Sequence, residues 1–294
     1  MVLLLFGATG LLGQAIRAET ARRKIDTVGI ARKGADHALD LTQASCVTSL
    51  FAAVRPHLVI NAAAQTNIDA CERDPGDAYQ INARAVAFIA EECRAADIPF
   101  AQISTDHYFV GHADRRHTET AAVTLVNEYA RTKYAGEAFA LTYDRALVVR
   151  TNITGFRGWA GQPTFAEWAL DALATRKPLR LFADCHSSTI DVTSFAHALF
   201  DLLARGATGV INVASRTTSS KRQFVQTLAR SIGIDLDWDE PGSVHSLPTC
   251  RADSLGLDVT LAESLLGYRL PTLEDICHSL ASQWTSRQCA MTPA

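Results

Sequence analysis

The sequence predicts an α/β fold in which a doubly wound parallel sheet carries a smaller C-terminal lobe. Two observations support this: short apolar segments alternate with amphipathic segments over residues 1–151, and the alternation loosens after that point. Strands that are covered by helices on both faces are short, continuous apolar runs of this kind. Right-handed crossovers between parallel strands then favour a Rossmann-type arrangement.

The first half of the chain supplies five strands and the helices between them. The expected strands are residues 2–6, 27–31, 57–64, 99–105 and 146–151. The expected helices are residues 12–23, 49–55, 76–97 and 127–143. Helical spacing of apolar residues such as Ile81, Ala85 and Phe88 supports the third of these helices.

The second half begins with a glycine-rich and polar loop at residues 151–164. We expect later helices at 165–177, 194–206 and 220–233, a late strand at 209–214, and two helices in the C-terminal tail. This predicts two domains. Residues 1–151 plus about 190–218 would form a Rossmann domain, and about 152–189 plus 219–294 would form the smaller lobe.

Composition excludes several classes of function. The chain has 294 residues, is 48% hydrophobic and 20% charged, and carries a net charge of -3, which favours neither nucleic acid nor a membrane surface as partner. The seven cysteines include no C-x-x-C pair and are odd in number, so we expect reduced thiols and a cytoplasmic protein. The start MVLLLF is too short for a signal peptide, and no apolar run is long enough for a membrane helix.

The first turn, in GATGLLG, predicts a phosphate-binding site. Gly7, Gly10 and Gly13 stand between an expected strand and an expected helix. Glycine permits a tight turn and a close approach of the backbone, and the helix start offers free N–H groups and the positive end of a dipole. The spacing G-x-x-G-x-x-G differs from the usual G-x-G-x-x-G of dinucleotide sites, and a plain strand-to-helix turn is the alternative.

The end of the second strand indicates which dinucleotide would bind. An acidic residue there suits the ribose 2'-hydroxyl of NAD, whereas this chain has Arg32 followed by Lys33. Cations favour a 2'-phosphate, so we expect NADP(H), with NAD(H) as the alternative.

A second motif, EYARTKYAGE, carries candidate proton-transfer chemistry. Tyr129 and Lys133 are four residues apart and share one face of the expected helix. An ammonium group near a phenol lowers its pKa and makes it a usable acid or base. Thr105, in ISTD at the end of the preceding strand, lies where open α/β sheets bind ligands, and its hydroxyl can bond the same carbonyl.

These motifs together resemble the extended short-chain dehydrogenase/reductase superfamily. The segments GATGLLG, VINAAAQTNID, ISTD and NEYARTKYAGE carry the resemblance, which covers nearly the whole chain. Within the superfamily the chain is most similar to the dTDP-4-dehydrorhamnose reductase group. The C-terminal segment RADSLGLDVTLAESLLGYRLPTLED also resembles that group.

The resemblance implies an NADPH-dependent oxidoreductase of deoxysugar biosynthesis that reduces a ketone on a nucleotide-linked 4-keto-6-deoxy sugar. Tyr129 would protonate the developing alkoxide, Lys133 would lower the pKa of Tyr129 and hold the nicotinamide ribose, and Thr105 would polarise the carbonyl. Cofactor contacts are implied for the turn and strand-end residues Gly7, Thr9, Gly10, Leu11, Leu12, Gly13, Arg32, Asp40, Leu41, Ala62, Ala63 and Ala64. Substrate contacts are expected from Thr66, Ile68, Asp106, Asn152 and Arg157. The sequence leaves undecided whether two copies of the chain form a homodimer.

Several positions depart from the group's pattern. His107 follows STD where the group has tyrosine, Val110 replaces an acid, and Asn152 and Ile153 stand where an aromatic residue is usual. These changes lie where sugar contacts are expected, so the sugar or the nucleotide of the substrate can differ from dTDP-4-dehydrorhamnose.

A metal site is not expected. His107, His112 and His117 recur every five residues, a spacing that lines one face of neither a helix nor a strand. Two other functions remain alternatives: a sugar-nucleotide epimerase or dehydratase of the same superfamily, and a non-catalytic nucleotide-binding subunit. The regulatory subunit of methionine adenosyltransferase resembles this same group, but the intact Thr105, Tyr129 and Lys133 argue against a non-catalytic role.

Overall fold

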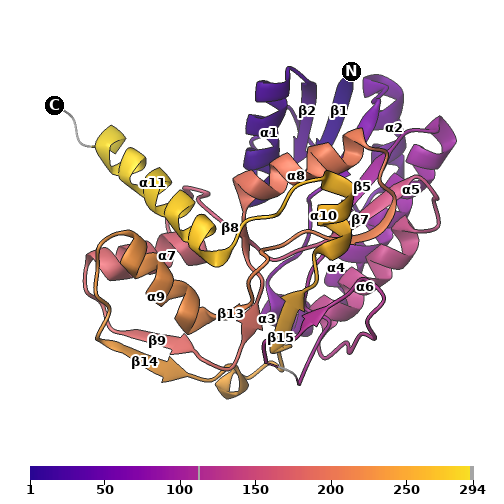
Figure 1. The fold of residues 1–294 in the computed structure, drawn as a ribbon. Helices are drawn as coiled ribbons and strands as arrows, with labels where there is room; N and C mark the ends of the chain where they lie inside the picture. Colours follow the sequence, from indigo (N-terminus) through magenta and orange to yellow (C-terminus); the bar gives the residue numbers. More distant parts are fainter. Residues whose placement is uncertain (112, 292–294) are drawn as a thin grey trace.

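A parallel sheet of seven strands forms the centre of the protein in the computed structural model, which describes residues 1–111 and 113–291 (Figure 1). Its strand order is β12-β7-β5-β4-β1-β2-β3, and every neighbouring pair is parallel. The strands are β1 (Val2–Phe6), β2 (Asp26–Ala31), β3 (His37–Ala38), β4 (Leu58–Asn61), β5 (Phe100–Ile103), β7 (Ala146–Arg150) and β12 (Gly209–Asn212). The order reverses between β1 and β4, so a crevice is expected at the carboxyl ends of these strands.

Helices cover both faces of the sheet. One face packs against α1 (Leu11–Arg23) and α8 (Val192–Ala204), with α10 (Thr260–Leu266) beyond them. The other packs against α2 (Ala44–Val54), α5 (Ala85–Ala96) and α6 (Glu128–Ala140). Alternate residues of β1 serve the two layers, since Leu3 and Leu5 join the first apolar cluster while Leu4 and Phe6 join the second.

The expected helix 76–97 is divided into three pieces. It consists of α4 (Pro75–Tyr79), a π-helical segment η1 (Gln80–Arg84) and α5, and α3 (Ile68–Arg73) precedes it. The π-helical segment lies against α6 at Gly136, where an added Cβ would come within 2.2 Å of the Asn82 carbonyl oxygen. Only glycine permits this close approach of α6 to the π-helical segment.

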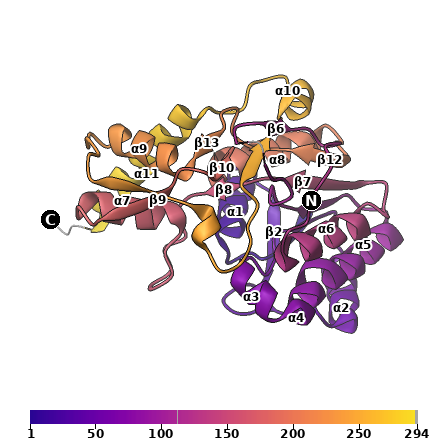
Figure 2. The ribbon, with the colours of Figure 1, turned by 90° about the horizontal axis from the view of Figure 1, so that it is seen from below.

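The smaller lobe is built from short strands and three helices. The short strands outside the central sheet are β6 (Arg116–His117), β8 (Ile153–Thr154), β9 (Leu179–Phe182), β10 (His186–Ser187), β11 (Ile190–Asp191), β13 (Ser219–Ser220), β14 (Asp239–Gly242) and β15 (Ser254–Leu257). The lobe's three helices among the described residues are α7 (Phe165–Ala174), α9 (Lys221–Ser231) and α11 (Leu273–Met291), and the 3-10 turn η2 (Val244–Ser246) lies between the last two. Figure 2 shows α7, α9 and α11 grouped on one side of the molecule and α2 to α6 on the other.

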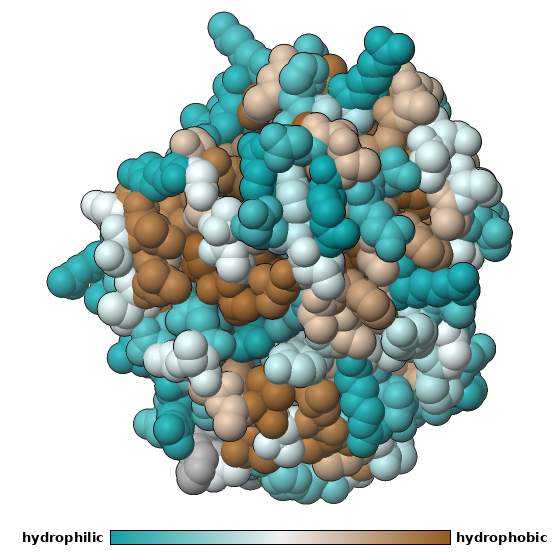
Figure 3. Space-filling model, turned by 90° about the vertical axis from the view of Figure 1, so that its right-hand side faces the viewer, coloured by the Kyte–Doolittle hydropathy of each residue, from teal (hydrophilic) through white to brown (hydrophobic). Residues whose placement is uncertain are grey.

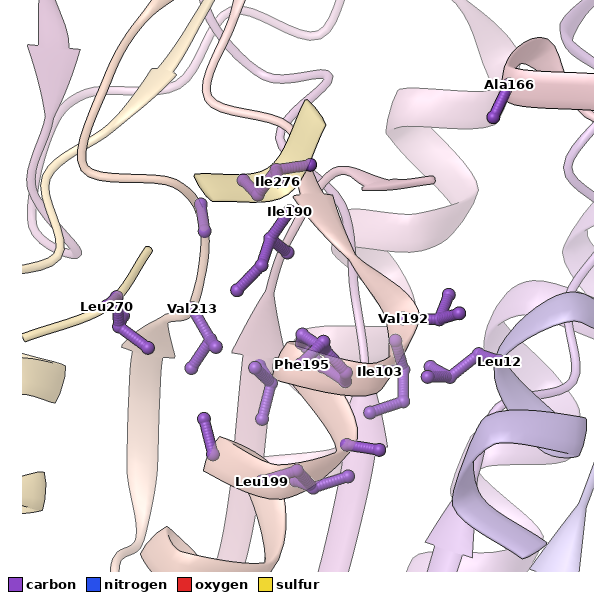
Figure 4. Close-up of a cluster of buried hydrophobic side chains, with 14 of the residues drawn as sticks. Leu12, Ile103, Ala166, Ile190, Val192, Phe195, Leu199, Val213, Leu270 and Ile276 are labelled. Carbon is purple, nitrogen blue, oxygen red and sulfur yellow. The ribbon is translucent and has the colours of Figure 1, made fainter. Parts of the chain in front are cut away.

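The lobe and the sheet share one apolar core. Figure 4 shows Leu12 of α1, Ile103 of β5, Phe195 of α8 and Ile276 of α11 around the same interior. The same cluster continues into α7 and α9 through Leu170 and Leu228. Burial of this apolar surface fixes the lobe over the carboxyl edge of the sheet.

The predicted α/β fold with a parallel sheet and a smaller lobe is confirmed. The expected strand 57–64 ends at Asn61, so the alanines that follow form an irregular strand end. On the face in Figure 3, apolar groups are interrupted by hydrophilic side chains. Among the described residues, no helix is long and apolar enough to span a bilayer. His112 lies outside the described residues.

Candidate active site

The turn between β1 and α1 can be made only with glycine at two positions. Gly7 has φ of 79°, and a Cβ on it would lie 2.7 Å from the backbone of Ala62 and Ala63. A Cβ on Gly13 would lie 2.1 Å from the Gly7 carbonyl oxygen. The turn is therefore held between the end of β4 and the first turn of α1 with no room for side chains.

The start of α1 fits a bound phosphate group. Gly10 is the N-cap and has no side chain to occupy the free N–H groups, and the bond from Gln14 N–H to the Gly10 carbonyl oxygen, at 3.0 Å, is the first of the helix. The N–H groups of Leu11, Leu12 and Gly13 belong to this first turn, where backbone donors have no partner within the helix. Together with the helix dipole they suit the diphosphate of a dinucleotide.

The loop after β2 lies beside this turn and presents two exposed cations. A Cβ on Gly34 would be 3.8 Å from Cγ2 of Thr9, and Arg32 and Lys33 are exposed. Asp36 is the acid of the loop. Its Oδ2 accepts bonds from the Gly29 N–H at 2.7 Å and from Arg17 at 2.9 Å, and these bonds hold the pKa of Asp36 below its ordinary value.

Asp40 and Leu41 follow β3 with different surroundings. Asp40 Oδ1 accepts bonds from the N–H (3.0 Å) and the hydroxyl (2.8 Å) of Thr42, which lower the pKa of this carboxyl group. Leu41 is half-buried against the cluster between the sheet and α2. The Asp40 carboxylate is thus hydrogen-bonded within its own turn. Leu41 offers an apolar surface near the loop after β2.

The three alanines that follow β4 pass close to the glycine turn. The Ala62 N–H donates to the Phe6 carbonyl at 3.0 Å, and the Ala63 N–H donates to Asn61 Oδ1 at 3.1 Å. Ala62, Ala63 and Ala64 are half-buried. Their small side chains leave the strand end accessible beside Gly7.

Asn82, in the π-helical segment, fixes the segment that follows the alanines. Its side-chain amide accepts from the Gln65 N–H at 2.8 Å and donates to the Gln65 carbonyl at 3.0 Å. It also donates to the Thr132 hydroxyl on α6 at 3.1 Å. Asn82 therefore links the strand end that precedes Thr66 to the helix that carries Tyr129.

The structure brings Thr105, Tyr129 and Lys133 together. Tyr129 lies in the first turn of α6, which is capped by the Asn127 side chain, and its phenol lies beside the Thr105 side chain, which acts to lower its pKa. Lys133, one turn further, donates from Nζ to the Ile103 carbonyl at 2.7 Å. All three are buried at the carboxyl end of β5.

Burial has the largest effect on the pKa values of Tyr129 and Lys133. It raises the pKa of Tyr129 to about 12, against a lowering by the Thr105 bond, and the charge of Asp106 raises it further. Burial also lowers the pKa of Lys133 to about 8. The expected lowering of the phenol pKa by the ammonium is wrong for this structure, because the loss of hydration outweighs the favourable interactions of the phenolate.

Asp106 and His107 continue from Thr105 toward the smaller lobe. Asp106 is 1% exposed, and its Oδ2 accepts a bond of 2.8 Å from the Asn152 amide. Burial raises the pKa of Asp106 to about 7 and lowers the pKa of His107 to about 4. The His107 ring meets the Tyr129 ring edge-on, with centroids 5.6 Å apart.

A cavity of about 410 Å³ opens beside these side chains. Of the predicted substrate residues, Thr66, Ile68 and Asn152 line it, and Asp106 lies directly behind Asn152. The lining also contains residues that are distant in the sequence, namely Asn67, Asp69, His107, Phe182, Cys185, Lys221, Val244, Arg251, Ala252 and Leu255.

Two cations of the lobe reach the cavity. Arg251 is paired with Asp69 at 3.1 Å, whereas Lys221 donates to the Ser187 hydroxyl at 3.4 Å and lies over the Phe165 ring. Sequence reasoning missed Lys221, because a lysine at the start of a helix carries no motif that relates it to a strand end so far away in the chain.

Arg157 lies beside the glycine turn, outside the lining of this cavity. Its carbonyl oxygen accepts a bond of 3.3 Å from the Gln14 side chain, which also donates to the Thr9 carbonyl. Its guanidinium group stacks on Trp159 and donates to the Gln162 carbonyl at 2.5 Å. Arg157 therefore lies closer to the start of α1 than to the cavity described above.

The described histidines do not converge on one point. His117 stacks on Phe109 with ring centroids 4.0 Å apart and bonds Ser254, whereas His107 lines the cavity. Within residues 1–111 and 113–291, no cluster of three or more histidine, cysteine or acidic side chains is placed to hold a metal ion.

Residues 1–272 match a protein family described as RmlD substrate binding domain. A probable low-salt glycan biosynthesis reductase, Agl14 of Haloferax volcanii, is 31% identical over 280 residues, which are 92% of this chain and 93% of the relative. The dTDP-4-dehydrorhamnose reductase of Escherichia coli is 30% identical over 267 residues, or 85% of this chain and 84% of that protein.

Among solved structures, the dTDP-4-dehydrorhamnose reductase of Bacillus anthracis in complex with NADP superposes with a TM-score of 0.86. It covers 96% of this chain and 99% of its own, at 23% sequence identity. At this identity the likeness concerns the fold.

Proposed function

The chain belongs to the RmlD substrate binding domain family, and from this premise we propose that it is an NADPH-dependent reductase of a nucleotide-linked 4-keto-6-deoxy sugar. The observation that carries the proposal is the convergence of Thr105, Tyr129 and Lys133 at the carboxyl end of β5, beside the cavity. Two relatives that are 31% and 30% identical over most of the chain are named as a probable low-salt glycan biosynthesis reductase and a dTDP-4-dehydrorhamnose reductase.

The cofactor would bind in the crevice between β1 and β4. Gly7, Gly10 and Gly13, with the N–H groups of Thr9, Leu11 and Leu12, would hold the diphosphate, and Arg157 would flank it. Arg32 would pair with a 2'-phosphate, Asp40 and Leu41 would border the adenine, and Ala62, Ala63 and Ala64 would lie along the dinucleotide. When bound, NADPH supplies the hydride that reduces the ketone.

Side chains of the protein would supply the proton and stabilise the charge that develops on the carbonyl oxygen. Tyr129, whose raised pKa keeps the phenol protonated near neutral pH, donates its proton to the oxygen of the reduced carbonyl. The Thr105 hydroxyl bonds the same oxygen and orients it toward the phenol. The ammonium of Lys133, held by the Ile103 carbonyl, provides positive charge near the oxygen where negative charge develops.

The smaller lobe would hold the rest of the substrate. We assign residues 1–151 plus about 190–218 to cofactor binding, and about 152–189 plus 219–294 to substrate binding. Thr66, Ile68 and Asn152 line the cavity, with Asp106 behind them. The cavity of about 410 Å³ has room for a hexose and part of a nucleotide.

NADPH oxidation by the purified protein tests the proposal. We expect oxidation with dTDP-linked or other nucleotide-linked 4-keto-6-deoxy sugars and none with the free keto sugar, because remote binding energy is needed to orient the ketone. No oxidation with any nucleotide-linked keto sugar would contradict a reductase. Conversion of a sugar nucleotide without net NADPH consumption would favour the epimerase alternative.

A further inference from the structure

A line of polar side chains leads from the Tyr129 phenol into the smaller lobe. The phenol lies close enough to the Thr105 side chain for this polar neighbour to lower its pKa, and the Thr105 hydroxyl donates to Asp106 Oδ1 at 3.4 Å. The other carboxyl oxygen, Oδ2, accepts from the Asn152 amide at 2.8 Å. Tyr129, Thr105 and Asp106 thus form a series of neighbouring polar groups with a carboxyl group at its inner end.

We propose that Asp106 is the proton source that restores the Tyr129 phenol after each turnover, through the Thr105 hydroxyl. The inference rests on the proposed reductase function and adds a catalytic role for a side chain that was expected only to contact substrate.

The proton count balances in three transfers. The Tyr129 O–H bond breaks as the substrate alkoxide gains a proton, which leaves a phenolate. The Thr105 Oγ–H proton then passes to the phenolate oxygen, and the proton of the neutral Asp106 carboxyl group passes to Thr105 Oγ. Asp106 is left as a carboxylate and regains one proton from solvent, so each turnover consumes one solvent proton.

The surroundings of Asp106 suit a group that is proton-loaded near neutral pH. Burial raises its pKa to about 7, against lowering by the Asn152 bond, the charge of Lys221 on α9 and the Thr105 bond. The groups that face it are Thr105 and His107 of its own loop, Tyr129 of α6, Asn152 after β7, and, from the smaller lobe, Cys185 and Lys221.

Lys133 makes a separate hydrogen bond in this arrangement. Its ammonium donates to the Ile103 carbonyl at 2.7 Å, on the strand that precedes Thr105. The neighbour of the phenol that can both accept and donate a proton is Thr105, since a hydroxyl group does both.

Solvent reaches the carboxyl group by way of His107 and the cavity. His107 Nε2 lies 3.8 Å from Asp106 Oδ1, and the ring lines the cavity. On the other side, Asn152 Oδ1 accepts from Thr189, whose hydroxyl contacts Ser187 at 2.9 Å. This fixes the Asn152 amide with its N–H side toward Asp106.

A comparison of first and later turnovers tests the relay in Asp106→Asn. Tyr129 enters the first turnover already protonated, whereas every later turnover needs a proton from the relay. We therefore expect D106N to slow steady-state NADPH oxidation at least about tenfold more than it slows the first turnover. Asp235→Asn, an exposed acid in the smaller lobe, is the matched control and should change neither rate.

Equal slowing of both phases in D106N would assign Asp106 to substrate binding alone and overturn the relay. If the wild-type protein oxidises no NADPH in its first turnover, the reductase function itself fails. Thr105→Ser, which keeps a hydroxyl group, should preserve the ratio of the two rates, and Thr105→Val should not.

The pH dependence of turnover is an independent test of the relay. The neutral acid is the active form, so wild-type steady-state turnover should fall as pH rises through about 7. Asn152→Ala removes a bond that lowers the pKa of Asp106, and should move this fall to higher pH. In the protein alone, the infrared band of a protonated carboxyl group should titrate near pH 7 and be absent from D106N. A midpoint below pH 5 would overturn the proposal.

Discussion

Individual side chains in this site owe their acidity mainly to burial. Tyr129 is 8% exposed and its pKa rises to about 12, while the pKa of Lys133 falls to about 8. A phenol with a raised pKa remains protonated at neutral pH, which suits a proton donor to an alkoxide.

Arg32 is the residue on which the choice of cofactor depends. Arg32→Ala should weaken NADPH binding roughly 10- to 100-fold, because a charged hydrogen bond to a 2'-phosphate contributes about 1.5–3 kcal/mol. NADH binding should change by less than about twofold. Titration of cofactor fluorescence measures both affinities.

Arg180→Ala, an exposed arginine on β9 in the smaller lobe, is the control for loss of positive charge. If Arg32→Ala weakens NADPH and NADH equally, the assignment of the 2'-phosphate to this loop is wrong, and Asp36 or another residue of the loop must be considered for the ribose.

At the scale of elements, the turn before α1 is the most constrained segment. The first turn of the helix rests on the backbone of Gly7 and Ala8 at Gly13, and Gly7 rests on the end of β4. Three elements therefore meet through main-chain atoms alone. This brings the free N–H groups of α1 to the point where the strand order of the sheet reverses.

Gly13→Ala should separate α1 from the turn. The added Cβ would lie 2.1 Å from a backbone oxygen that no side-chain rotation can move. We expect a lower melting temperature, corresponding to about 1–3 kcal/mol of strain, and at least tenfold weaker NADPH binding. Calorimetry and cofactor titration measure the two effects.

Gly76→Ala provides the contrast within the same chain. A Cβ there would have Asp74 Oδ1 at 3.5 Å as its nearest neighbour, an ordinary contact at the start of α4. This variant should melt at or above the wild-type temperature and bind NADPH normally. A Gly13→Ala protein with unchanged cofactor affinity would contradict the role given to the turn.

Across the whole molecule, the sequence predicts most strands of the central sheet and misses the strands outside it. Five-residue strands such as β1 and β7 are nearly continuous apolar runs, and their pattern is visible in the sequence. Strands β8, β10, β11 and β13 have two residues each, and so short a pairing has no periodicity to detect. They form because the lobe closes over the sheet.

The residues of the candidate site also divide into those that the sequence predicts and those that it misses. Gly7, Thr105, Tyr129 and Lys133 follow strands or share a helix, so local spacing is enough to group them. Lys221 joins them only through tertiary packing, and the sequence offers no sign of it. Arg157 was expected near the substrate and lies beside the glycine turn, because the loop after β8 bonds Gln14 of α1.

Turnover by Tyr129→Phe tests the central claim most directly, since the change removes only the phenolic oxygen. We expect kcat for NADPH oxidation to fall at least about 100-fold while NADPH affinity stays within about twofold. Tyr134→Phe, at an exposed tyrosine of the same helix, should behave as wild type. A Tyr129→Phe protein that retained kcat within a few-fold of wild type would contradict the account, because the proton would then come from another group.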